Sequence, residues 1–245
     1  MANSHDSPQN SWVKIRNSYP LQQAAQSAKP SSKGVLLFED LLWFLYRRLK
    51  GRPPFTYFVA RKVLWGMLSG ELSLSAALHA CNQINDEFAR KHNVAVVHAA
   101  FDLLKDFDKY CMKFSTQYLP FSTESPDLAI RIPTDNFFVH DGRTIFPLFQ
   151  LAKQDGPSNY QRGLMVGVAT MALVRAGFDN PEVWIVDCSE LPGTKVRAPR
   201  IYQPEHLIVP TEHEIGNYLS LLAEVHQFIA LHTEDEIRER AGRGR

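Results

Sequence analysis

The first half of the chain repeats large apolar side chains every three or four residues, which is the spacing of one face of an α-helix. Ser73 stands where it can cap one of these segments. The pattern predicts four helices, at 35–50, 56–68, 73–92 and 95–114, with a break at the Gly-Arg-Pro-Pro sequence of 51–54. The first half is therefore expected to be helical.

After Pro120 the pattern changes to short apolar runs separated by turn residues, as is typical of strands. Asp141-Gly142 is a strong hairpin dipeptide. Pro147 needs a bulge or an unpaired edge, because proline cannot donate to a sheet ladder. The expected elements are strands at 128–132, 137–140, 144–152, 182–188 and near 200–203, and helices at 158–174 and 212–231.

Polar, turn-forming composition marks both ends of the chain. Residues 1–33 are rich in Ser, Gln, Asn and Pro, and the end carries many charges with Gly and Arg. Such segments bury too little apolar surface to offset their ordering entropy. We expect flexible tails at 1–33 and 236–245, a helical part at 34–94 and an α/β domain at 95–235.

Composition limits the class of protein. The 245 residues are 44% hydrophobic with a net charge of +1, so the chain can bury a core and is no polycation. The three cysteines lie far apart with no Cys-x-x-Cys, which favours a reducing, cytoplasmic location. The longest apolar run, 164–174, is about half of what a membrane-spanning helix needs. We expect no membrane span.

One basic segment stands out from this neutral average. Residues 41–70 contain no acidic side chain but carry six cations, Arg47, Arg48, Lys50, Arg52, Arg61 and Lys62. Guanidinium groups pair well with phosphate, and exposed aromatic residues among them could stack on bases, so nucleic acid is the expected partner. An acidic partner protein or an anionic membrane surface fits the same charges. Alternatively, the aromatic residues form the core of a helical pair and the cations its solvated rim.

The predicted order of elements across 95–188 is helix, three strands, helix, strand. Pro126-Asp127 opens the first of these strands, and Gln150 to Lys153 ends the third. In this combination the region resembles the core of the PD-(D/E)XK nuclease-like superfamily. The resemblance implies an α+β fold with a helical N-terminal part followed by an α/β restriction-endonuclease-like core.

The resemblance also implies site residues. In that superfamily, acidic residues on neighbouring strands hold one or two Mg²⁺ ions, which activate water for phosphodiester hydrolysis. By position, Asp127 and Asp141 are the candidate metal ligands. Gln150 stands where most members have an acid, and Lys153 would be the charge-stabilising lysine.

Two departures favour a non-catalytic protein. Gln150 is neutral and holds Mg²⁺ less well than a carboxylate. Gln150 and Lys153 are three residues apart, so a regular strand without a bulge points them to opposite faces. Asp127 and Asp141 also have an ordinary interpretation as turn residues.

The sequence thus predicts a nucleic-acid-associated protein with a nuclease-like core. If it is an enzyme, it is a Mg²⁺-dependent phosphodiesterase; otherwise it is a binding module on the same fold. The alternative is an assembly subunit that docks on a protein partner through its helical, basic N-terminal half.

Overall fold

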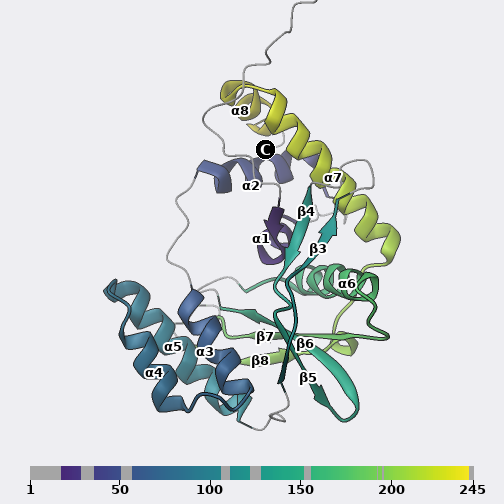
Figure 1. The fold of residues 1–245 in the computed structure, drawn as a ribbon. Helices are drawn as coiled ribbons and strands as arrows, with labels where there is room; N and C mark the ends of the chain where they lie inside the picture. The colour runs from purple at the N-terminus through teal and green to yellow at the C-terminus, as the bar shows by residue number, and fades with distance from the viewer. Residues whose placement is uncertain are drawn as a thin grey trace, which may run out of the picture.

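The computed structural model describes residues 18–28, 36–50, 57–105, 111–121, 128–151, 156–191, 193–194 and 196–242, without the side chains of 48–50. The fold is α+β, as predicted, with two sheets and helices on both sides of the larger one (Figure 1). Within this part of the chain, no helix is long and apolar enough to cross a membrane.

The larger sheet has five strands in the order β2-β5-β6-β7-β8. β6 and β7 are parallel, and the other neighbours are antiparallel. The strands are β2 (Cys111–Lys113), β5 (Asn136–His140), β6 (Arg143–Gln150), β7 (Glu182–Asp187) and β8 (Arg200–Tyr202). The helix α6 (Asn159–Arg175) connects β6 to β7.

Both faces of β6 and β7 are covered, which explains why the middle of each strand is a continuous apolar run. Phe146 and Leu148 belong to a core cluster that also contains residues of α6 and α7 (Glu212–Leu231). Phe149 faces the other way, into a cluster with α3 (Phe58–Leu68) and α5 (Glu87–Leu104). α4 (Leu74–Asn82) completes this second helical group (Figure 1).

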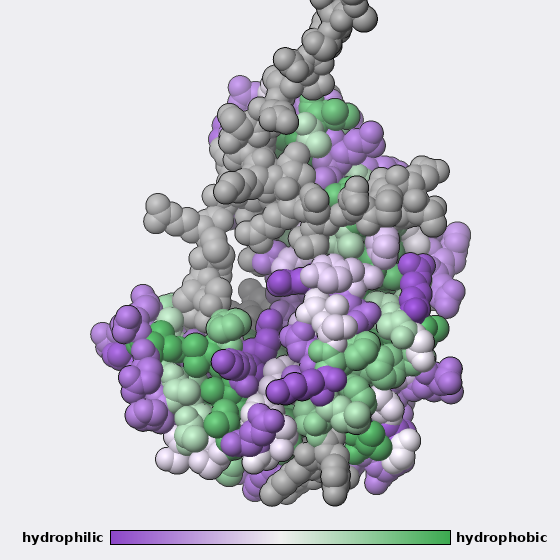
Figure 2. Space-filling view, viewed as in Figure 1, coloured by the Kyte–Doolittle hydropathy of each residue, from purple (hydrophilic) through white to green (hydrophobic). Residues whose placement is uncertain are grey.

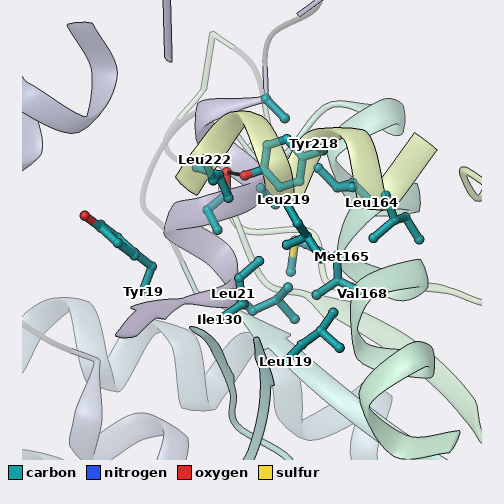
Figure 3. Close-up of a cluster of buried hydrophobic side chains, with 14 of the residues drawn as sticks. Tyr19, Leu21, Leu119, Ile130, Leu164, Met165, Val168, Tyr218, Leu219 and Leu222 are labelled. Carbon is teal, nitrogen blue, oxygen red and sulfur yellow. Dashed lines mark hydrogen bonds between the residues drawn. The ribbon is translucent and has the colours of Figure 1, made fainter. Parts of the chain in front are cut away.

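The smaller sheet has the order β1-β4-β3, with β1 (Ser18–Pro20), β3 (Gln117–Pro120) and β4 (Ala129–Ile132). Leu119 and Ile130 lie opposite each other and are fully buried. Figure 3 shows them beneath the helices α1 (Leu21–Ser27), α6 and α7, with Leu21 and Tyr218 in the same cluster.

Several expected elements are confirmed. The hairpin at Asp141-Gly142 has positive φ at both residues, 50° and 73°, as a type I′ turn requires. Ser73 caps α4, and Ser158 caps α6 through a capping box with Gln161. Pro147 needs no bulge, because the β6–β7 ladder runs through it without interruption and the β5 pairing ends at Ile145.

Other expectations are corrected. The predicted helix at 73–92 breaks, and α5 begins at Glu87, because Asp86 accepts a hydrogen bond from the Ala89 N–H and caps a new helix. Residues 111–113, expected in a helix, form β2. The strand predicted at 128–132 is present as β4, and it pairs with β1 and β3 in the smaller sheet, apart from the other predicted strands.

The expected tails are partly ordered. Within 1–33, β1 and α1 bury Tyr19 and Leu21 in the main core, and the Tyr218 hydroxyl donates a hydrogen bond to the Ala24 carbonyl at 2.5 Å. At the other end, α8 (Glu234–Gly242) packs against α2 (Phe38–Lys50), where Arg240 pairs with Glu39 at 3.0 Å. α1 and α8 both contact α2 (Figure 1).

Candidate nucleic-acid interface

Gln150 and Asp187 lie side by side at the carboxyl ends of the parallel strands β6 and β7. Register partners in parallel strands point to the same face, here the face covered by α6. Gln150 is 3% exposed and Asp187 is fully buried. This edge of an α/β sheet is where ligands commonly bind.

The Asp187 carboxylate is surrounded by donors. Its Oδ1 accepts a hydrogen bond from the Ser189 N–H at 2.9 Å. Its Oδ2 lies 3.2 Å from Arg162 Nη2 and 3.7 Å from Arg200 Nη2. We call Asp187, Arg162 and Arg200 the Asp187 cluster. Arg162 comes from the first turn of α6 and stacks on Tyr202 of β8, 4.0 Å from the ring centroid, so the cluster ties helix to sheet.

Unpartnered buried polar atoms gather around this cluster. Among the described residues, Arg162 Nε, Arg200 Nε, Ser189 Oγ and Glu190 Oε2 are buried and have no hydrogen-bond partner. Cys188 is next to Asp187 in the chain but is buried in the core cluster of α3 and α5, and burial, assisted by the charge of Asp187, raises its pKa to about 12. Its thiol therefore stays protonated near neutral pH and is a poor nucleophile.

The described residues do not form a Mg²⁺ site here. A dication at Gln150 would need the Asp187 carboxylate, whose oxygens already accept from Ser189 and two guanidinium groups. Those positive charges oppose a second cation at the same place. Within the described ranges, no three His, Cys, Asp or Glu side chains come together as a metal site.

The structure separates Asp141 from Gln150. Asp141 lies in the β5–β6 turn and Gln150 at the far end of β6, whose length from Arg143 to Gln150 is about 23 Å at about 3.3 Å per residue. One metal ion therefore cannot bind both. Asp127 and Lys153 lie outside the described residues, so their roles stay predictions.

The basic segment is divided between two places. Arg47 lies on α2, which packs against α7 and α8, and its guanidinium stands 5.8 Å from the Trp43 ring centroid. The side chains of Arg48 and Lys50, and Arg52 as a whole, lie outside the described residues. Arg61 and Lys62 lie on α3, which packs against α4 and α5. Its cations with described side chains, Arg47, Arg61 and Lys62, therefore lie on two helices that pack against different parts of the fold.

Tyr46 of the segment is buried, and Tyr57 and Trp65 are partly buried against the core, as the alternative interpretation expected. The Trp65 ring packs edge-on against Phe149, with centroids 5.2 Å apart. The Tyr57 hydroxyl accepts a hydrogen bond from Arg197 Nη2 at 2.9 Å, and burial raises its pKa. Phe58, in contrast, is exposed.

Arg61 connects three parts of the fold. Its Nη2 donates to Gln22 Oε1 at 3.3 Å, and Gln22 Nε2 donates to the Phe149 carbonyl at 2.5 Å, next to Gln150. Gln22 lies two residues after Pro20, and Pro20 pairs with Arg131 of β4. Arg61 therefore lies where α3, the start of α1 and the end of β6 meet.

Arg61 and Arg131 are close enough to repel each other. Burial lowers the pKa of Arg61, and the positive charge of Arg131 lowers it further, while Asp135 acts in the opposite direction. Asp135 is exposed and accepts a hydrogen bond from Thr116 Oγ1 at 2.5 Å. We call Arg61, Lys62 and Arg131 the α3–β4 cations. With Asp135 included, these groups carry an excess of positive charge.

Sequence reasoning missed Arg131 and Gln22. The alternation Ala-Ile-Arg-Ile over 129–132 places Arg131 on the solvent side of a strand, and this signal was present. No sequence signal marked Gln22, because its role depends on α1 packing beside β6.

On the face drawn in Figure 2, hydrophilic residues gather at the centre, between the α3–α5 group and the sheets.

No protein-family model and no curated protein matches this chain. A structure from Eubacterium rectale, described as a "putative exonuclease", is similar over 99% of this chain and 87% of its own, with 11% identity and a TM-score of 0.43. SSO0001 is similar over 80% of this chain and 85% of its own, with 12% identity and a TM-score of 0.37. Both likenesses are too distant to carry an argument about this chain.

Proposed function

We propose that the protein binds nucleic acid without cleaving it, through the α3–β4 cations at the junction of its helical group and its two sheets. The observation that carries the proposal is the pair Arg61 and Arg131. Arg61 donates a hydrogen bond to Gln22, two residues after Pro20, which pairs with Arg131, so both cations lie at one junction. Burial and the positive charge of Arg131 both lower the pKa of Arg61. A phosphate between them relieves that repulsion and offers both a matched acceptor.

The non-catalytic part of the proposal rests on the edge beside this surface. Gln150 replaces the acid that the nuclease-like resemblance requires, and the neighbouring Asp187 is already neutralised by Arg162 and Arg200. Binding needs neither residue to hold a metal.

The test is to replace both arginines by glutamine, Arg61→Gln and Arg131→Gln, and to measure fluorescence anisotropy with a labelled oligonucleotide over a series of salt concentrations. Each lost phosphate contact lowers the slope of log affinity against log salt by about 0.7 to 0.9. We expect weaker binding and a slope lower by about 1.5 for two contacts.

The matched control is Arg143→Gln with Arg175→Gln, which removes two exposed arginines at the opposite end of β6 and the end of α6. The control should bind like the wild type. A wild type that does not bind, or an equal loss in both double variants, overturns the proposal. Incubation of the wild type with Mg²⁺ and a labelled oligonucleotide tests the proposal that the protein does not cleave nucleic acid. A cleavage product would contradict it.

A further inference from the structure

Phe58 is an exposed aromatic ring beside the α3–β4 cations. It is the first residue of α3, and its side chain is 69% exposed. Arg61 and Lys62 follow three and four residues later, so all three side chains share one side of the helix. Exposure of a whole phenyl ring to water is unfavourable, which makes this placement informative.

Tyr118 makes a similar arrangement on the smaller sheet. It lies directly opposite Arg131 in the β3–β4 ladder, and it is 55% exposed. Its neighbour Leu119 is fully buried, so the alternation of the strand turns Tyr118 to the outer face together with Arg131. Directly opposed residues have Cβ atoms about 5 Å apart.

The two elements therefore carry the same pair, an exposed ring next to a cation. Arg61 donates a hydrogen bond to Gln22, two residues after Pro20, and Pro20 pairs with Arg131 in the β1–β4 ladder, so the two pairs lie on either side of one short segment. In the described part of the chain, neither ring stacks on another ring or a guanidinium group. Phe88 is exposed to the same degree as Tyr118, 55%, but its ring packs against His92 at 4.4 Å.

We propose that this surface takes single-stranded nucleic acid, with bases stacked on Phe58 and Tyr118 and phosphates bound by the α3–β4 cations. This inference rests on the proposed function. Bases of a duplex are stacked on each other and cannot lie on a protein ring, whereas an unpaired strand offers both bases and phosphates. Rings placed among cations match a ligand that offers both unpaired bases and phosphates. A duplex offers only its phosphates, so the rings would contribute nothing to binding it.

The test compares affinities for single-stranded DNA, single-stranded RNA and duplex DNA of the same length. The variant is Phe58→Ala with Tyr118→Ala, and the control is Phe88→Ala with Met112→Ala, two side chains of similar exposure on α5 and β2. Circular dichroism and urea unfolding establish that both variants fold.

We expect the wild type to bind one of the single strands more tightly than the duplex. Loss of each stacked base weakens binding by at least about fivefold, so the ring variant should lose about 25-fold or more, and the control little. The salt slope should stay unchanged, because the phosphate contacts remain. Tyr118→Phe, which keeps the ring, should bind like the wild type.

Failure of this inference is separable from failure of the proposed function. If no probe binds, the proposed function itself is wrong. If binding depends on Arg61 and Arg131 but is equal for duplex and single strand, or is unaffected by the loss of both rings, only the single-strand inference is overturned.

Discussion

Two arginine clusters lie near the carboxyl end of β6, and they differ in their counter-charge. Arg162 and Arg200 share the Asp187 carboxylate, which is fully buried beneath α6. The positive charge of Arg131 lowers the pKa of Arg61, and the exposed Asp135 is the charge that opposes it. The comparison separates two uses of the same residue type. The first pair stabilises the fold, and the second pair is the one that we propose binds phosphate.

Burial decides which use is possible. A carboxylate removed from water needs its donors, and removing one partner of such a buried pair is costly. A charge at the surface is screened by water and salt and contributes little to stability. The Asp187 cluster is therefore expected to matter for folding and the α3–β4 cations for binding.

The largest expected effect is that of Asp187→Asn. The amide cannot balance Arg162, which would then be largely buried without a counter-charge, or the partly exposed Arg200, and the free energy of unfolding should fall by about 3 to 5 kcal/mol. Urea unfolding followed by circular dichroism measures the change. The control Asp179→Asn, at an exposed carboxylate, should stay within about 0.5 kcal/mol. A small effect at Asp187 would contradict the structural role of the cluster.

A smaller effect is expected from Gly156→Ala. A Cβ at Gly156 would lie 2.7 Å from Ser189 Oγ and 3.2 Å from Asp187 Oδ2, so the cluster must shift, at a cost of about 1 to 3 kcal/mol. Because Ser189 Oγ has no hydrogen-bond partner, adding Ser189→Ala should restore most of the loss.

Gly216→Ala on α7 is the matched control. A Cβ there meets no atom within 4 Å, and alanine favours a helix over glycine by about 1 kcal/mol. This variant should therefore be stabilised slightly under the same unfolding conditions. If Gly156→Ala behaved the same way, the close approach to the Asp187 cluster would not constrain the fold.

The C-terminal half of the fold followed its sequence pattern closely. Strand alternation, the Asp141-Gly142 turn and the Ser158 cap are local signals, and each element they predict is present. Pairing between distant segments is not local. The assignment of β4 to a separate sheet, and the burial of Tyr19 and Leu21 from a polar segment, depend on packing partners more than a hundred residues away.

The candidate site was predictable only in part. The basic segment included Arg61 and Lys62, and composition sufficed to find them. Their partner Arg131 comes from a strand that reaches α3 only through the tertiary fold. The sequence also suggested that the cations of 41–70 act together because they are close along the chain. α2 and α3 are neighbours in sequence but pack against different helices.

The smallest expected change in stability is that of Arg131→Gln, and it is the sharpest test of the comparison. The side chain is exposed, and its charge opposes that of Arg61, so its removal should change the free energy of unfolding by no more than about 0.5 kcal/mol. Any gain in stability should appear at low salt and fade at high salt, because screening already weakens the repulsion there. Urea unfolding at two salt concentrations measures both quantities, with Arg175→Gln as the exposed control on α6.

The same Arg131 variant should bind nucleic acid more weakly, since a phosphate contact is lost while the fold is kept. A loss of more than about 1 kcal/mol would place Arg131 with Arg162 and Arg200 as a residue of the fold, and the contrast between the two clusters would disappear.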